Sequence, residues 1–341
     1  MPAPLLEACH RRPVDHTPVW FMRQAGRYMP EYRRIRASHS ILELCKRADL
    51  AAEVTLQPVE ILDVDAAIIF ADLLLPVEPM GLKLEFLAGE GPSIDPPIRK
   101  LADIEALSTA NGADLGYVGE AIAQVKQQLN GRVPVIGFIG APFTLASYIV
   151  EGGSSRNYLH TKRLMYGEPA AWQKLMEKIV EVLVPYAASQ VAAGAEVIQV
   201  FDSWVGALSP GDYAKNVLSY SQELIRRIQA TGVPVVHFGT GAGPFLDLLH
   251  QAGGDVLGLD WRMRLNEAWS SIGHEAAVQG NLDPVALFAP LPELRRQVED
   301  VMRRAAGRPG HIFNLGHGIL PETPVENVKA VVRMVREFSA A

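Results

Sequence analysis

Short apolar segments alternate with amphipathic segments along all 341 residues of the chain. Eight of the apolar segments are rich in β-branched and aromatic residues, which favours strands. Most of them are continuously apolar, and this is typical of strands that are covered on both faces, as in a parallel sheet between helices. The eight predicted strands are 18–22, 65–70, 133–140, 195–201, 233–238, 255–259, 276–280 and 310–314.

Helical patterns follow the predicted strands. Apolar residues recur at helical spacing from Trp172 to Val184, which predicts a helix that packs on the sheet. A single helix is predicted over 212–230, because Ser-Pro-Gly precedes it and Thr-Gly follows it. The last helix is predicted over 325–338. The alternation indicates an α/β protein built from successive βα units.

Eight βα units without internal linkers predict a single-domain (β/α)8 TIM barrel over 1–341, with an N-terminal extension at 1–17. A doubly wound sheet with an appended domain is the alternative. Two segments depart from a plain barrel. A surface hairpin is predicted within about 76–99, and the loop 151–157, which begins Glu-Gly-Gly, either folds over a site or is an ordinary solvent loop.

The uncharged run 133–150 invites interpretation as a membrane span. It contains two prolines and two glycines, however, which suit a buried strand and a turn better than a spanning helix. No N-terminal targeting segment is visible, so we expect a cytoplasmic protein without membrane contact. Cys9 and Cys45 show no CxxC spacing, which fits a reducing compartment and provides no zinc motif.

Composition narrows the function classes further. With 48% hydrophobic and 21% charged residues, the chain has the composition of an ordinary globular protein. The net charge of −6 argues against a nucleic-acid partner. Against this acidic balance, the stretch 23–36 holds five arginines and a single acid, Glu31. Arginine suits bidentate capture of carboxylate or phosphate, so the stretch predicts an anion-binding surface, and a solvated basic helix is the alternative.

Polar residues follow the predicted strands, where barrel enzymes build their sites. Because the carboxyl ends of parallel strands share one rim, we expect these side chains to converge on a single site. In chain order they are Arg23, Arg27, Asp72, Tyr148, Asp202, Ser203, Asp260, Asn281, Asp283 and His317, and His237 lies inside the fifth predicted strand.

Asp72 is the sharpest candidate, because its carboxylate lies between two apolar runs. Burial would raise its pKa, whereas a nearby arginine would lower it and keep the anion. Such an anion can accept several N–H donors and stabilise developing positive charge; alternatively Asp72 caps the next helix or pairs with one arginine. His317 lies between two glycines that permit close ligand approach, and a hydrogen-bonded loop histidine is the alternative.

The other motifs give weaker indications of function. The stretch 239–244 resembles a dinucleotide loop, but its sixth position is proline. Ser203 lacks a nucleophile-elbow context and is interpreted as a hydrogen-bonding residue. His237 is expected to be a satisfied core histidine, and Asp260 and Asp283 are expected to be structural acids at the rim. Neither a cofactor nor a metal is predicted.

Together these residues resemble the uroporphyrinogen decarboxylase family. The segment Pro-Val-Trp-Phe-Met-Arg-Gln-Ala-Gly-Arg-Tyr-Met-Pro-Glu-Tyr-Arg, 18–33, is similar to the family's N-terminal signature, and 137–153 is similar to its second. The segments 65–72, 201–203 and 314–318 match further positions in order. The resemblance covers essentially the whole chain. It implies a (β/α)8 barrel, usually a homodimer, that removes CO2 from the four acetates of uroporphyrinogen III without a cofactor and yields coproporphyrinogen III.

The resemblance also implies residue roles. Asp72 would bind the pyrrole N–H groups and stabilise the cationic intermediate, and Arg23 is the proposed proton donor. Arg23 and Arg27 would bind substrate carboxylates, and Arg33, Arg34 and Arg36 are interpreted as surface residues. The family more often has glutamate at the position of Asp202. The implied substrate-binding residues are Arg23, Gln24, Ala25, Gly26, Arg27, Asp72, Tyr148, Ser203 and His317.

Two alternatives differ in class. A corrinoid-dependent methyltransferase of the same superfamily would share the fold, but it would need zinc-binding His and Cys residues at the strand ends. A non-catalytic tetrapyrrole-binding protein would keep the arginines and would not need Asp72.

Overall fold

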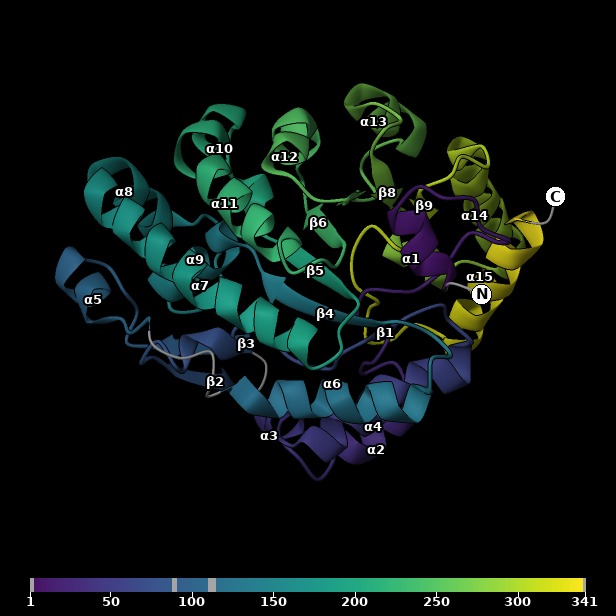
Figure 1. The fold of residues 1–341 in the computed structure, drawn as a ribbon, viewed down its shortest axis with the longest axis horizontal. Coiled ribbons are helices and arrows are strands. Elements are labelled where there is room, and N and C mark those ends of the chain that lie inside the picture. The colour runs from purple at the N-terminus through teal and green to yellow at the C-terminus, as the bar shows by residue number, and fades with distance from the viewer. Residues whose placement is uncertain (1–2, 88–90, 110–114, 340–341) are drawn as a thin grey trace.

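A curved sheet of seven parallel strands forms the centre of the protein (Figure 1). The computed structural model describes residues 3–87, 91–109 and 115–339. Neighbouring strands follow one another in chain order, as βα units require. The strands are β1 (Ala67–Ile68), β4 (Val135–Gly140), β5 (Val197–Asp202), β6 (Val235–Gly239), β7 (Val256–Gly258), β8 (Ala277–Gln279) and β9 (His311–Ile312).

The first predicted strand, 18–22, is wrong as a strand. Val19 forms one parallel bridge with Phe313, beyond the end of β9. On its other side the Val19 carbonyl accepts the N–H of Asp65 at 2.8 Å, just before β1. The segment therefore occupies the eighth position of a TIM-barrel-like fold and closes the sheet through a single residue.

Side chains explain why this segment does not extend into a strand. They accept backbone N–H groups that a neighbouring strand would otherwise bind. The three oxygens are Asp65 Oδ2, bonded to Val19 at 2.8 Å, Gln24 Oε1, bonded to Phe21 at 3.0 Å, and Asn314 Oδ1, bonded to Met22 at 3.0 Å.

Helices form the outer layer around the sheet, and the first and last of them, α1 and α15, lie on the same side of the molecule (Figure 1). Their bounds are α1 (Pro4–Cys9), α2 (Pro30–Arg36), α3 (Ile41–Lys46), α4 (Ala48–Leu62), α5 (Leu101–Ala106), α6 (Gly116–Leu129), α7 (Pro142–Glu151), α8 (Leu159–Gly167), α9 (Pro169–Ala192), α10 (Pro210–Asn216), α11 (Leu218–Gln229), α12 (Leu246–Ala252), α13 (Leu265–Ile272), α14 (Leu291–Ala305) and α15 (Val325–Ser339).

The helix predictions are confirmed at α9 and α15 and corrected once. The predicted helix over 212–230 is two helices, α10 and α11, which meet at Val217. Val217 has φ −131° and ψ −42°, outside the helical range. The first of the two also begins earlier than predicted, because Ser209 caps it by accepting the N–H of Asp212 at 3.1 Å.

The predicted hairpin is present as β2 (Lys83–Leu87) and β3 (Gly91–Asp95), and its tip at 88–90 lies outside the described residues. It is joined to the loop that follows α7, because Ser93 bridges to Gly153. Gly153 has φ +156°, and a Cβ there would lie 2.7 Å from the carbonyl oxygen of Pro92. Only glycine fits this close approach.

In the described part of the chain, no helix is long and apolar enough to cross a bilayer. The uncharged run 133–150 is divided between β4 and α7, so a strand does begin it as predicted. Cys9 and Cys45 are free and buried. Burial raises the pKa of the Cys9 thiol to about 12, so this side chain behaves as a small core residue.

Candidate active site

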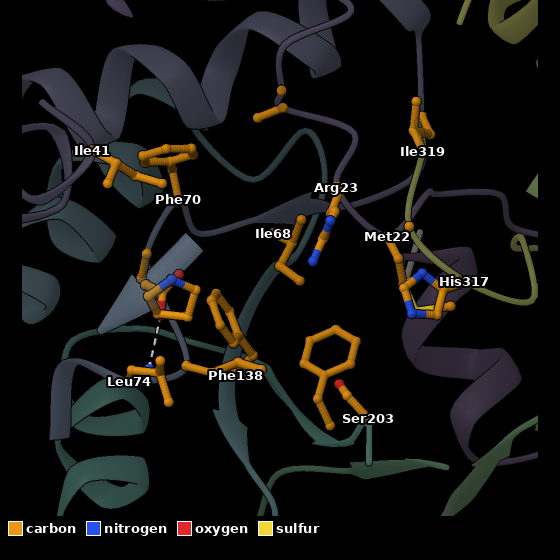
Figure 2. A pocket seen from close by; sticks show the side chains of 18 of the residues that line it. Met22, Arg23, Ile41, Ile68, Phe70, Leu74, Phe138, Ser203, His317 and Ile319 are labelled. Atoms are coloured by element: carbon orange, nitrogen blue, oxygen red, sulfur yellow. Dashed lines mark hydrogen bonds between the residues drawn. The ribbon is translucent and has the colours of Figure 1, made fainter. Parts of the chain in front are cut away.

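A cavity of about 460 Å³ opens at the carboxyl ends of the strands. Figure 2 shows side chains from distant segments pointing toward this common space, Arg23 from one side, Ser203 from below and His317 from another. The structure thus brings together most of the predicted site. The predicted residues that line the cavity are Arg23, Ala25, Gly26, Arg27, Asp72, Tyr148, Ser203 and His317.

Arg23 and Arg27 lie on the turn that follows the segment 18–22. Among the described residues, neither has a carboxylate within ion-pair distance. Arg23 has φ +61°, a left-handed conformation that is costly for a residue with a Cβ. Its side chain lies against Gly318, where a Cβ would be 2.5 Å from Arg23 Cδ. The strained backbone and the adjacent glycine together direct this guanidinium into the pocket.

Gln24 departs from its prediction as a substrate-binding residue. It is fully buried and does not line the cavity. Its side-chain amide donates to the Ala66 carbonyl at 2.9 Å, its Oε1 accepts the Phe21 N–H, and its backbone carbonyl accepts the Tyr28 hydroxyl at 2.7 Å. Gln24 therefore holds the arginine turn against the start of β1, and the charged residues on either side face the pocket.

Asp72 follows β1 by a few residues. Its Oδ1 accepts the Leu74 N–H at 2.9 Å, drawn as the dashed line in Figure 2. This bond closes a turn and does not cap the following 3₁₀ helix, Leu75–Val77, whose N-cap is Leu74, so the capping alternative is wrong. Burial raises the pKa of this carboxyl, while the Leu74 N–H and the charge of Arg23 oppose the rise. The second oxygen remains available to a ligand. The group is a partly desolvated acceptor that a cation would stabilise as an anion.

His317 forms the opposite wall. Burial lowers the pKa of its imidazole to about 4, and the charges of Arg23 and Arg262 add to this effect. The ring is therefore neutral near pH 7 and can donate or accept a hydrogen bond. Trp261 packs edge-on against it, with ring centroids 6.1 Å apart. The Arg262 guanidinium lies 3.9 Å from the centroid of the Trp261 ring, which fixes the tryptophan in turn.

Tyr148 and Ser203 complete the polar lining. Burial raises the pKa of Tyr148 to about 12, and the charge of Asp72 contributes, so its hydroxyl stays protonated. The Tyr148 ring packs on Trp204, with centroids 5.6 Å apart. Ser203 directly follows β5. Both side chains offer neutral hydroxyl groups to a ligand.

Aromatic rings form the floor of the cavity. Phe138 lies within β4, and Phe201 and Phe238 lie one residue before the ends of β5 and β6; all three line the cavity. Their rings meet edge to face, with centroids 5.7 Å and 6.1 Å apart. These residues were missed as site residues, although inward alternation at the strand ends could have identified them. The floor suits a large, ring-shaped, largely apolar ligand whose charges point to the rim.

The cavity exists because β1 and β4 separate. They pair at two positions in the described residues. Beyond these, the backbone N–H and carbonyl of Phe138 bind a side chain instead of β1. Gln190 Oε1 accepts the Phe138 N–H at 2.9 Å, and Gln190 Nε2 donates to the Phe138 carbonyl at 3.0 Å. On the other edge, Thr55 Oγ1 accepts the Phe70 N–H at 2.8 Å. Two helical side chains thus replace strand pairing, and no sequence motif marks them.

The remaining predictions fall outside the cavity. Arg33, Arg34 and Arg36 are exposed, and Arg34 pairs with Glu31 at 3.8 Å, as expected of surface residues. Asp260 is buried and accepts the Gly241 and Arg262 N–H groups, which confirms a structural role.

His237 is buried, as predicted for a core histidine, and burial lowers its pKa to about 4. Backbone groups of Leu249 and Gly253 lie beside its ring and oppose this shift, as expected of a histidine in the core. Asp283 accepts the Val285 N–H at 2.9 Å and caps a short 3₁₀ helix. Over the described ranges, no three His, Cys, Asp or Glu side chains are grouped so that they could hold a metal.

Known proteins resemble this chain over nearly its full length. The family model described as "Uroporphyrinogen decarboxylase (URO-D)" matches residues 2–338. A uroporphyrinogen decarboxylase of Solibacter usitatus is 65% identical over 338 residues, covering 99% of this chain and 98% of its own. One of Carboxydothermus hydrogenoformans is 55% identical over 336 residues, covering 98% and 96%.

Solved structures show the same fold. A methyltransferase from Methanosarcina mazei has a TM-score of 0.82, covers 98% of both chains and is 24% identical. A B12-independent methionine synthase from Shewanella sp. has a TM-score of 0.56, covers 84% of this chain and 86% of its own, and is 12% identical. At these identities the similarity concerns the fold and not the activity.

The role of Gln190 is testable through stability. Gln190→Leu leaves the buried Phe138 N–H and carbonyl without partners, which should lower the free energy of unfolding by roughly 2–5 kcal/mol. Urea unfolding measures the loss. Gln173→Leu, on the exposed face of the same helix, is the matched control and should change it by less than about 0.5 kcal/mol. Equal effects of the two substitutions would show that the side-chain pairing at Phe138 is unimportant.

Proposed function

The chain belongs to the uroporphyrinogen decarboxylase family and is a carboxy-lyase of tetrapyrrole biosynthesis, and we propose that its reaction takes place in the cavity lined by Arg23, Arg27 and Asp72. The reaction removes CO2 from the four acetate side chains of uroporphyrinogen III and yields coproporphyrinogen III. The observation that carries the assignment is that one cavity with an aromatic floor holds a desolvated carboxylate and two arginines without an ion-pair partner among the described residues.

Substrate binding follows from charge and shape. Uroporphyrinogen carries eight carboxylates on a flexible macrocycle, and carboxylates are the groups that guanidinium binds best. Arg23 and Arg27 have no protein carboxylate to compete for them within the described residues. The ring system rests on Phe138, Phe201 and Phe238. Charged groups at the rim and apolar atoms on the floor match the two parts of this substrate.

Asp72 provides the main electrostatic stabilisation of the cationic intermediate. Loss of CO2 requires a place for the electron pair of the breaking C–C bond. Protonation of the adjacent pyrrole carbon creates a cationic ring that accepts this pair. Asp72 accepts the pyrrole N–H groups and stabilises that cation, and a preorganised anion in a dry site does this more strongly than water. Arg23 is the proposed donor of the ring proton, and its charge already acts on Asp72.

The steps balance. After the ring carbon is protonated, the acetate C–C bond breaks, CO2 leaves, and an exocyclic methylene forms on the now neutral ring. A proton adds to this methylene to give the methyl group, and the ring carbon returns its own proton. The net change is one proton consumed and one CO2 released for each acetate. Neutral His317 and the hydroxyls of Tyr148 and Ser203 contribute hydrogen bonds that orient the ring.

The two alternatives fit the residues less well. A methyltransferase that activates thiols with zinc needs His and Cys ligands at the strand ends. Here the cysteines are buried outside the cavity, and arginines occupy its wall. A tetrapyrrole-binding protein without activity would have no need for a desolvated carboxylate in its pocket, since burying a carboxylate costs stability.

The assignment is tested by turnover. Purified protein, incubated anaerobically with uroporphyrinogen without added metal, should yield porphyrins with seven to four carboxylates after oxidation and chromatography. Asp72→Asn should fold and bind product but lose about 10³-fold in kcat, because the amide cannot stabilise the cation. Asp49→Asn, at an exposed carboxylate, is the control. Recovery of the eight-carboxylate porphyrin alone from folded wild-type protein would refute the function.

The arginines should act mainly through binding. Arg27→Gln removes a charge-assisted hydrogen bond to a substrate carboxylate, and kcat/KM should fall about 10- to 100-fold, mostly through KM. Arg27→Lys should recover part of the loss, and added salt should raise the wild-type KM. Arg33→Gln, on the exposed side of α2, should leave kinetics unchanged. An unchanged KM in Arg27→Gln would remove this residue from substrate binding.

We further propose that two copies associate in the cytoplasm, without nucleic acid as a partner. Support comes from the net charge of −6, the free cysteines and an exposed apolar group formed by Val285, Phe288 and Leu291, which are 59%, 41% and 51% exposed. Sedimentation velocity should give a dimer, and Phe288→Glu should shift it to monomer, with the exposed Leu159→Glu as control. A wild-type monomer at micromolar concentration would contradict this proposal.

A further inference from the structure

We propose that Asp202 and Thr144 form a positioning pair that sets Ser203 and Tyr148 in register for the reaction. This inference rests on the proposed function, because it assigns a role in that reaction to two residues that do not touch the pocket. Both are fully buried, and neither lines the cavity.

Asp202 is the last residue of β5, between two residues that face the cavity. Phe201 and Ser203 both line it, so strand alternation turns the Asp202 side chain the other way, toward α7. There its Oδ1 accepts the hydroxyl proton of Thr144 at 2.8 Å. This bond ties the end of β5 to the first turn of the neighbouring helix.

Thr144 has one hydroxyl proton, and the group that accepts this proton determines the donor and acceptor roles in the neighbouring hydrogen bonds. Because that proton goes to Asp202, the Thr144 oxygen acts as acceptor toward the backbone N–H of Trp204, at 3.3 Å. The backbone on either side of Ser203 is thereby anchored, at Asp202 through its side chain and at Trp204 through its N–H. A group that could only donate at position 202 would reverse this polarity.

Tyr148 is linked to this network through Trp204. Thr144 and Tyr148 are four residues apart on α7 and therefore share a face of the helix, one turn above the other. At the upper turn the Tyr148 ring meets the Trp204 ring, with centroids 5.6 Å apart. Contacts thus run from Asp202 through Thr144 and Trp204 to Tyr148, and Ser203 lies between Asp202 and Trp204 in the chain, which fixes the two hydroxyl-bearing residues relative to each other.

The chemistry of Asp202 is costly for a purely structural residue. Its second oxygen, Oδ2, has no hydrogen-bond partner among the described residues. Burial raises the pKa of this carboxyl to about 7. A buried acid with an unsatisfied oxygen lowers stability relative to a well-packed apolar residue. Such a group is retained where its acceptor does something an apolar side chain cannot, which here is to orient Thr144.

The test distinguishes the effect of the Thr144 hydroxyl group from the effect of the shape of its side chain. Thr144→Val keeps the volume and removes the bond, and we expect kcat to fall about 10-fold while KM changes less than about 2-fold, since the arginines still bind the substrate. Thr144→Ser restores the hydroxyl and should recover at least about half of kcat. Thr161→Val is the matched control, because Thr161 is another buried threonine that donates to a carboxylate, Glu151 at 2.9 Å, outside the cavity.

A double-mutant cycle then distinguishes positioning from general damage. In the Tyr148→Phe, Ser203→Ala background the two positioned hydroxyls are gone, so adding Thr144→Val should lower kcat less than about 2-fold. A loss of the same factor in both backgrounds, or a Thr144→Ser enzyme as impaired as Thr144→Val, overturns the inference.

Rates are compared for protein that is folded by circular dichroism at the assay temperature. If Thr144→Val does not fold, the same cycle is run with Asp202→Asn and Asp202→Leu, where only the amide keeps an acceptor for Thr144. Additive losses in that cycle also overturn the inference. An inactive wild-type protein refutes the proposed function itself, whereas an active wild type without coupling refutes only the positioning pair.

Discussion

The structure depends on one constraint, which is that every buried backbone N–H and carbonyl must find a partner. A closed barrel meets it by pairing strands, but a barrel that opens a cavity at its rim cannot. Here side chains provide the missing partners on both sides of the opening. Asp65, Gln24 and Asn314 bind the segment before the arginine turn. Gln190 binds β4 where it separates from β1, and Thr55 binds Phe70 on the side of β1 that faces away from β4. The stability of the pocket therefore depends on these side-chain hydrogen bonds, which take the place of strand pairing.

Electrostatics determines what the opening can hold. A chain of net charge −6 places in one cavity a desolvated carboxyl and two guanidinium groups that have no ion-pair partner in the described part of the chain. The arginines favour anionic ligands, and the carboxyl favours a ligand that becomes cationic. A molecule with carboxylates at its edge and a ring that is transiently protonated meets both demands. The neutral imidazole of His317 adds no further charge to this balance.

Precision in the site comes from residues that never reach it. Trp261 holds His317, and Asp202 with Thr144 braces Ser203 and Tyr148. Each acts through packing or one directed hydrogen bond. Catalytic groups must be placed to within a fraction of an ångström, so such supports matter as much as the groups themselves.

The sequence alone determined the fold class, the strand-end location of the cavity and most of its polar lining, but not its aromatic floor. Apolar periodicity is local, and the rule that parallel strands present their carboxyl ends to one rim converts chain order into proximity. Tertiary structure decided what periodicity does not encode. The segment 18–22 looks like a strand, yet side chains as distant as Asn314 take its N–H groups. Gln24 lies within the signature but is buried, and Gln190 lies in an ordinary helical pattern but repairs the sheet. Such bonds join residues up to 292 positions apart, so only the folded chain reveals them.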